Sequence, residues 1–227
     1  MDQTYFTLEE KALVKQHISQ LIAMLGSQVS SHDINTVHNI VKHGIEADYY
    51  KRDKHGINPV VRIFRTAVML NQLIAPDRNM TIATMVYNLT RLGFVSEDEI
   101  GKIFGDDIGK LVHGLINVSR LYKKQAAVEN DNFHKLLLTF AEDIRVIIIM
   151  IVDRLNLMRA INHHPDEKFV HDISSESRYL YAPLAHRLGL YTIKSELEDL
   201  SLKYLNRRVY NQIAAKLNET KQRRDNY

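Results

Sequence analysis

The sequence predicts an all-α fold of about ten helices, and three observations support this prediction. Apolar residues recur at helical spacing along nearly the whole chain, whereas almost no segment alternates apolar and polar residues as a half-buried strand does. The 227 residues include only four prolines and nine glycines, mostly at breaks between apolar runs. Side chains typical of helix N-caps precede several of these runs. We therefore expect one multi-helix domain over residues 1–227.

The first four helices are predicted between residue 7 and residue 93. Thr7 caps the first helix, whose apolar positions continue to Gly26. Ser31 and Asp33 offer the cap of the second helix, and a polar link separates it from the third. A Pro-Asp-Arg-Asn sequence interrupts the pattern before the fourth. These helices are expected over residues 7–26, 31–45 and 60–73 and, for the fourth, over a range that includes 85–93.

The remaining helices follow a strong start signal at Ser96. This residue precedes three acidic side chains, which favour a helix N-terminus through the helix dipole, and Gly105 ends the short helix that results. Helical spacing of apolar residues then predicts further elements. They cover roughly residues 106–123, 129–141, 144–161, 166–187, 190–204 and 207–222.

Composition and charge exclude several classes of protein. The absence of cysteine removes disulfides, thiolate nucleophiles and thiolate metal sites. The longest apolar run, residues 146–152, is far short of the roughly 20 residues that span a bilayer, and no export signal is visible. A net charge of +3 does not indicate nucleic-acid binding. The basic residues near 221–224 are expected to be a solvated helix end or a linker in preference to a binding patch. We expect a soluble cytoplasmic protein that contacts neither membrane nor nucleic acid.

Two features in the middle of the chain suggest a functional site. Asp153 directly follows seven apolar residues, so its carboxylate is expected to be buried and to need a cation or hydrogen-bond donors. It is either the ion-pair partner of a nearby arginine or a residue of a binding site. In the predicted fourth helix, four side chains share one face and can point into a single pocket. They are Tyr87, Asn88, Arg91 and Leu92.

Two groups of residues in the second half of the chain match motifs of a known family. Residues 152–159 read Val-Asp-Arg-Leu-Asn-Leu-Met-Arg, which is similar to the family motif Ala-Asp-Arg-Leu-His-Asn-Met-Arg. Residues 182–189 read Ala-Pro-Leu-Ala-His-Arg-Leu-Gly, and residues 194–201 read Lys-Ser-Glu-Leu-Glu-Asp-Leu-Ser, where the family has Trp in place of Ser195. On these motifs the chain resembles the RelA/SpoT family, the long enzymes that make and degrade the alarmone (p)ppGpp. The resemblance covers roughly residues 44–217.

The resemblance implies an all-α hydrolase domain of the HD type. In the family this domain precedes a synthetase domain and regulatory domains, so the implied partner of this chain is the synthetase domain of the full-length protein. In the active family domain, a His, a His-Asp pair and a distant Asp hold one Mn²⁺. A Glu-Asp pair helps to activate the water that removes the 3′ pyrophosphate. These residue types suit a divalent cation that lowers the pKa of its bound water.

When the family's metal ligands and Glu-Asp pair are aligned with this sequence position by position, most of them are replaced by other residue types. These positions fall, in order, on Arg62, Tyr87, Asn88, Arg91, Leu92 and Asp153. Arginine is permanently protonated and leucine has no donor atom, so neither can be a ligand. One carboxylate cannot hold the ion, and we expect loss of Mn²⁺, no metal and no catalytic residue. Either Arg62 and Arg91 pair with Asp153 and replace the charge of the metal, or they turn to solvent.

Residues that would contact a nucleotide are also altered. Lys54 and Arg159 match basic residues of the guanine site of the family, but the arginine expected beside Lys54 is Asp53. Two further polar contacts of that site are replaced by Leu157 and Ala160. Basic side chains nevertheless remain that could attract an anion, so weak guanine-nucleotide binding stays open. The candidates are Lys54, Arg62, Arg91 and Arg159.

The resemblance leaves three functions to compare. The first is an inactive pseudo-hydrolase domain that regulates a GTP pyrophosphokinase of the stringent response. The second is an active Mn²⁺-dependent guanosine-3′,5′-bis(diphosphate) 3′-pyrophosphohydrolase with a rearranged site, and the third is a (p)ppGpp sensor without turnover. The first is favoured, because helix-packing motifs persist while the site positions do not, and packing alone preserves a scaffold.

Overall fold

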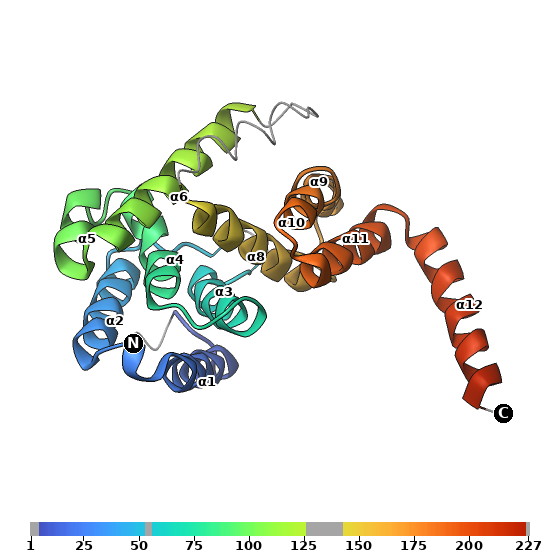
Figure 1. The fold of residues 1–227 in the computed structure, drawn as a ribbon, viewed down its shortest axis with the longest axis horizontal. Helices are drawn as coiled ribbons and strands as arrows, with labels where there is room; N and C mark the ends of the chain where they lie inside the picture. Colours follow the sequence, from blue (N-terminus) through green and yellow to red (C-terminus); the bar gives the residue numbers. More distant parts are fainter. Residues whose placement is uncertain (1–4, 53–55, 126–142, 226–227) are drawn as a thin grey trace. The chain divides into compact units, whose positions relative to one another are not determined.

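The computed structural model describes residues 5–52, 56–125 and 143–225, and every regular element in these ranges is helical (Figure 1). The predicted all-α fold is therefore confirmed. The chain divides into two compact units, Met1–Asn156 and Leu157–Tyr227. The helix expected over 129–141 lies outside the described residues. Within the described ranges, no helix combines the length and the apolar character needed to cross a bilayer.

The first unit contains six helices and most of a seventh in its described part. The last of them, α8, continues past the end of this unit. Their bounds are α1 Leu8–Leu25, α2 Ser31–Glu46, α3 Pro59–Leu73, α4 Arg78–Arg91, α5 Glu97–Phe104, α6 Asp106–Gln125 and α8 Ile144–Ala160, with a short 3₁₀ turn, η1, at Gly26–Gln28.

Capping residues fix the starts of these helices. Thr7 and Ser96 form capping boxes as the sequence predicts, each with the glutamate three residues later. The cap of α2 is Ser30 and not Ser31, because Ser30 and Asp33 bond each other's backbone N–H groups. Asn58 caps α3, which places its proline in the first turn, where a missing N–H costs nothing.

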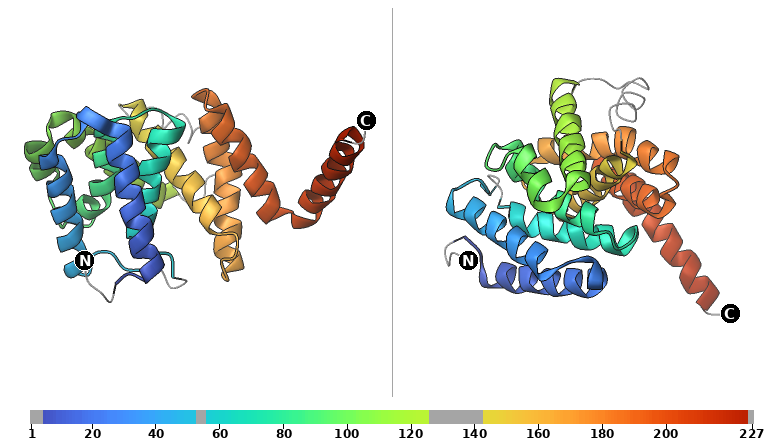
Figure 2. Two further views of the ribbon diagram at one scale, coloured as in Figure 1. Left: turned by 90° about the horizontal axis from the view of Figure 1, so that it is seen from below. Right: turned by 60° about the vertical axis from the view of Figure 1, so that its left-hand side comes forward.

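Helix α4 is the centre of the first unit. It packs against α2, α3 and α6, while α1 packs along α3, as the views in Figure 2 show. Its residues Ala83, Val86 and Leu89 are completely buried. In α8 the apolar run is buried as expected, since five of its members, Val146, Ile147, Ile149, Ile151 and Val152, are at most 1% exposed.

The second unit packs its helices against α11. This helix contacts α9, the π-helical turn η2, α10 and α12. The bounds are α9 Glu167–Glu176, η2 Ser177–Tyr181, α10 Ala182–Arg187, α11 Tyr191–Leu205 and α12 Arg207–Asp225.

The single helix predicted over 166–187 contains a π turn. In this turn the N–H of Ala182 bonds the carbonyl of Ser177, five residues back. Pro183 explains the turn, because its ring has no N–H and clashes with the carbonyl four residues earlier in a regular α-helix. The wider turn moves that carbonyl away and lets the helix continue.

Candidate functional site

An ion pair between Arg62 of α3 and Asp153 of α8 forms the centre of the candidate site. The Nε of Arg62 donates to Oδ1 of Asp153 at 3.2 Å, and its Nη2 contacts Oδ2, so the guanidinium binds both carboxylate oxygens. The two side chains are 32% and 29% exposed, so most of each lies within the protein. The structure shows Asp153 in an ion pair, with Arg62 bound to the carboxylate and not turned to solvent.

Two buried polar side chains support this pair. Thr66 donates its hydroxyl to Oδ1 of Asp153 at 3.1 Å. The Nδ2 of Asn156 donates to the hydroxyl of Thr66 at 2.8 Å and to the backbone carbonyl of Arg62 at 2.9 Å. Thr66 and Asn156 are each 1% exposed. The network therefore fixes the carboxylate, since α3 presents two residues one turn apart and α8 presents two more.

The face of α4 that carries Tyr87, Asn88, Arg91 and Leu92 contains a hydrogen-bonded pair of its own residues. Arg91 donates from Nε and Nη2 to Oδ1 of Asn88, at 3.2 and 2.6 Å, within its own helix. Leu92 follows the last helical residue as the C-cap and is 42% exposed. Tyr87 and Asn88 are half-buried. Among the described residues, the partners of Asp153 are Arg62 and Thr66, so Arg91 does not pair with it.

This donor set does not fit a divalent cation. Both oxygens of Asp153 already accept hydrogen bonds, and a guanidinium stands where the resemblance would place a metal-binding imidazole. In the described part of the chain, no group of three or more His, Asp or Glu side chains could hold a metal ion. A fixed guanidinium supplies charge but has no exchangeable ligand position for water.

The other nucleotide candidates are held elsewhere or lie outside the description. In the second unit, Arg159 donates from Nε and Nη2 to the two carboxylate oxygens of Glu196, at 2.6 and 2.7 Å. The hydrogen bond with Glu196 raises the pKa of Arg159. Lys54 and its neighbour Asp53 lie outside the described residues. The positive charges of Arg62 and Arg159 are thus balanced by carboxylates of the chain itself.

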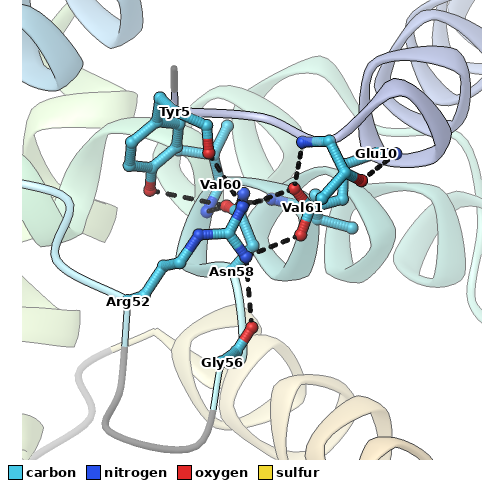
Figure 3. A network of polar contacts seen from close by, with 8 residues as sticks. Tyr5, Glu10, Arg52, Gly56, Asn58, Val60 and Val61 are labelled. Atoms are coloured by element: carbon cyan, nitrogen blue, oxygen red, sulfur yellow. Dashed lines mark hydrogen bonds and ion pairs between the residues drawn. The ribbon is translucent and has the colours of Figure 1, made fainter.

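A second network, shown in Figure 3, secures the segment that precedes α3. Arg52 donates to the carboxylate of Glu10 and to the backbone carbonyls of Tyr5 and Gly56. The side-chain hydrogen bond from Arg52 lowers the pKa of Glu10, and burial raises the pKa of Tyr5 to about 12. The Tyr5 hydroxyl lies 3.4 Å from Oδ1 of Asn58, so this network ends at the cap of the helix that carries Arg62.

Sequence reasoning missed these supporting residues for identifiable reasons. Glu10 and Arg52 are 42 residues apart, and no local pattern connects them. Thr66 and Asn156 are ordinary polar residues within apolar helices. Their spacing was the available signal, since Thr66 lies one turn after Arg62 and Asn156 lies three residues after Asp153.

A family model described as HD domain matches residues 43–191. The chain is 32% identical over 178 residues to a GTP pyrophosphokinase of Myxococcus xanthus, a match that covers 77% of this chain and 23% of that protein. It is 31% identical over 186 residues to a guanosine-3′,5′-bis(diphosphate) 3′-pyrophosphohydrolase of Aquifex aeolicus, covering 78% and 26%. A GTP pyrophosphokinase rsh of Brucella ovis is 36% identical over 154 residues, covering 67% and 20%. The chain thus spans about a quarter or less of each of these relatives.

Proposed function

Because this chain belongs to the HD domains of the RelA/SpoT family, we propose that it is a pseudo-hydrolase, a domain that keeps the hydrolase scaffold without its metal chemistry. Its role would be regulatory, as a module of a cytoplasmic GTP pyrophosphokinase of the stringent response. One observation carries the proposal. Arg62, at the position of a metal-binding histidine in the resemblance, holds both oxygens of Asp153, the last ligand position that keeps its carboxylate.

The chemistry of that pair supports the absence of hydrolysis. A hydrolase of this type needs a cation with an open position, which lowers the pKa of a bound water and contacts the phosphates. A guanidinium binds a carboxylate tightly but leaves nothing on which water can ionise. Arg91 and Leu92, at the Glu-Asp positions of the resemblance, contribute no general base. An active hydrolase with a rearranged site is therefore the weaker reading.

Binding of (p)ppGpp without turnover is a second candidate with less support. A nucleotide with several phosphates needs cations that are free to turn towards it. Arg62 and Arg159 are each bound through two nitrogens to a carboxylate, so a phosphate would have to displace that partner. We expect guanine nucleotides to bind weakly at most.

The proposed partner is the synthetase domain of the same polypeptide. The curated relatives are about four to five times as long as their matched region, and two of the three carry the name GTP pyrophosphokinase. The activity of the whole protein would be pyrophosphate transfer from ATP to the 3′ hydroxyl of GTP or GDP. We propose no nucleic-acid contact for this domain.

A hydrolysis assay tests the proposal. The 227-residue chain is incubated with ppGpp and Mn²⁺, and released pyrophosphate is measured. We expect no release above the protein-free rate. A matched variant restores the residue types of the resemblance through Arg62→His, Tyr87→His, Asn88→Asp, Arg91→Glu and Leu92→Asp, and Mn²⁺ titration calorimetry should show that it gains metal binding. Release by the natural chain that depends on Mn²⁺ and disappears in Asp153→Asn would overturn the proposal.

A further inference from the structure

We infer that α1, α2, α3 and α4 line a second site, a pocket partly open to solvent, which binds a small uncharged molecule with an apolar body. A cavity of about 340 Å³ lies between these helices in the first unit. Ile18 and Ile22 of α1, Val37 of α2, Phe64 of α3, and Ile82 and Met85 of α4 contribute to its wall. This inference does not depend on the proposed regulatory function.

The cavity arises from the way in which the first two helices pack. Helix α1 packs on α3, whereas α2 packs on α4, so the two N-terminal helices contact different neighbours. The turn η1 joins them and begins at Gly26, whose φ of 53° allows the chain to change direction there. Space remains between their facing apolar residues. Ile22 borders this space and is 42% exposed, which leaves a route of entry from solvent.

The polar side chains deep in the wall already have partners. Asp33 accepts hydrogen bonds from Nε of Arg78 at 3.0 Å and from the cap Ser30. Thr81 donates to the carbonyl of Asp77 at 2.7 Å and accepts from the Nδ2 of Asn71 at 2.8 Å. The one deep charge is therefore neutralised within the protein, and these groups do not call for a charged ligand.

Size and lining determine the class of ligand. A volume of about 340 Å³ falls within the range of roughly 300–1,000 Å³ that is typical of small-molecule pockets. Apolar cavities of this kind favour hydrocarbon over water, since water would find few hydrogen-bond partners there. Asn35 and His38 also line the cavity and are exposed, so they mark a polar rim. The arrangement fits an uncharged molecule with one hydroxyl-like group at the rim and an aliphatic or aromatic body inside.

Competition binding with the whole chain tests the site and the charge argument together. The neutral fluorescent probe N-phenyl-1-naphthylamine should bind saturably at one site and should be displaced by 1-decanol. Decanoate and decylammonium have the same alkyl chain with a negative or a positive head group. We expect each to displace the probe at least about tenfold less effectively, because their charge finds no partner in the wall. Fluorescence that rises without saturation, or equal displacement by all three compounds, would overturn the inference.

Two matched variants locate the site. Ile22 lines the cavity and Ile103 of α5 does not, although they are similarly exposed, at 42% and 40%. Ile22→Trp should weaken probe binding by at least about fivefold by occupying the entrance, and Ile103→Trp should leave it unchanged. Methyl NMR of the natural chain provides a measurement that does not depend on either variant. Decanol should shift the methyl signals of Ile18, Ile82 and Met85, and shifts confined to other methyl groups would contradict the inference.

Discussion

At the scale of single residues, the guanidinium of Arg62 does for Asp153 only part of what a divalent cation does. It balances the charge and satisfies both oxygens, so the carboxylate can remain largely buried. Unlike a metal ion, the guanidinium is part of a side chain and is planar. It has no coordination position at which a water molecule could replace a ligand. The pair is suited to holding α3 and α8 together and unsuited to activating water.

Removing Arg62 tests how much that pair contributes to stability. Arg62→Ala leaves the carboxylate of Asp153 with Thr66 as its remaining described donor, and we expect a loss of about 1–3 kcal/mol in the free energy of unfolding by urea. The double variant Arg62→Ala with Asp153→Ala should lose less than the sum of the single changes. Arg65→Ala, an exposed arginine of the same helix, is the control and should stay within about 0.5 kcal/mol. Strictly additive single changes would contradict the coupling.

Asp33 predicts a dependence of stability on pH. The hydrogen bond from Arg78, followed by those from Ser30, holds the pKa of Asp33 at about 2, below its ordinary value of 3.8. A lowered pKa favours the folded state above the unfolded pKa, so this contribution is complete above about pH 5 and is lost as the pH falls towards 2. The shift corresponds to about 2 kcal/mol. Asp33→Asn should remove it at pH 7, and the difference from the natural chain should shrink below pH 4.

Glu99 offers the matched control for Asp33. It is the same third residue of a capping box, with Ser96 as its cap, but it is exposed. Glu99→Gln should therefore change stability much less than Asp33→Asn at pH 7. Equal effects of the two substitutions would show that the capping geometry, and not the pair with Arg78, accounts for the stabilisation.

The residues of the site were predictable in part. Arg62 and Asp153 followed from motif positions and from the rule that a buried carboxylate needs a partner. The sequence left Arg91 two options, Asp153 or solvent, but the structure shows a third, Asn88, three residues earlier on the same helix. Which partner Arg91 binds depends on its distance from Asp153 in the folded chain. The helical spacing of residues in the sequence does not give that distance. Lys54 lies outside the described residues, so its predicted role stays a prediction.

At the scale of elements, local signals located helix starts better than helix interiors. Thr7 and Ser96 were recognisable because a capping box is a short-range pattern. The π turn before Pro183 was not, because a proline within an apolar helical pattern is compatible with a kink, an end or a wider turn. Packing of the flanking residues against α11 decides among these, and packing is not local information.

A pair of glycines tests the packing of α2 on α4. A Cβ at Gly44 would lie 2.8 Å from Cδ2 of Leu89 and 3.1 Å from Cε2 of Tyr50, both of which are buried. We expect Gly44→Ala to cost about 1–3 kcal/mol in urea unfolding, because overpacking outweighs the gain in helix propensity. Gly101→Ala in α5 meets no atom within 4 Å and should stabilise the chain by about 0.5–1 kcal/mol. Stabilisation by both substitutions would contradict the close packing at Gly44.

At the scale of the whole molecule, charge is distributed unevenly between the two units. The first unit has 18 basic and 18 acidic residues, and the second has 12 and 9, so the net charge of +3 lies wholly in the second. The neutral first unit contains both the Arg62 pair and the apolar cavity. Neither feature needs a metal ion, so we expect the stability of the chain to be independent of added or removed metal.

Chelation provides a test on the intact chain. A domain that holds a structural or catalytic metal is stabilised by it and loses stability with EDTA. We expect the melting temperature of this chain to change by less than about 1 °C on addition of either EDTA or Mn²⁺. The five-substitution variant described above is the positive control, in which Mn²⁺ should raise the melting temperature. A clear fall in the melting temperature of the natural chain with EDTA would show that metal is bound after all.

If the chain is the pseudo-hydrolase proposed above, the pairing of Arg62 with Asp153 also makes a return to metal binding difficult. A return to histidine at position 62 alone would remove the positive charge before any other ligand was in place, leaving Asp153 with Thr66 as its remaining described partner. That intermediate would be less stable than the present chain and would bind no ion. Several substitutions would have to arise together before selection could favour them. Under the proposed function, the ion pair would therefore act as an evolutionary ratchet, because no single substitution would both keep the site stable and restore a metal ligand set.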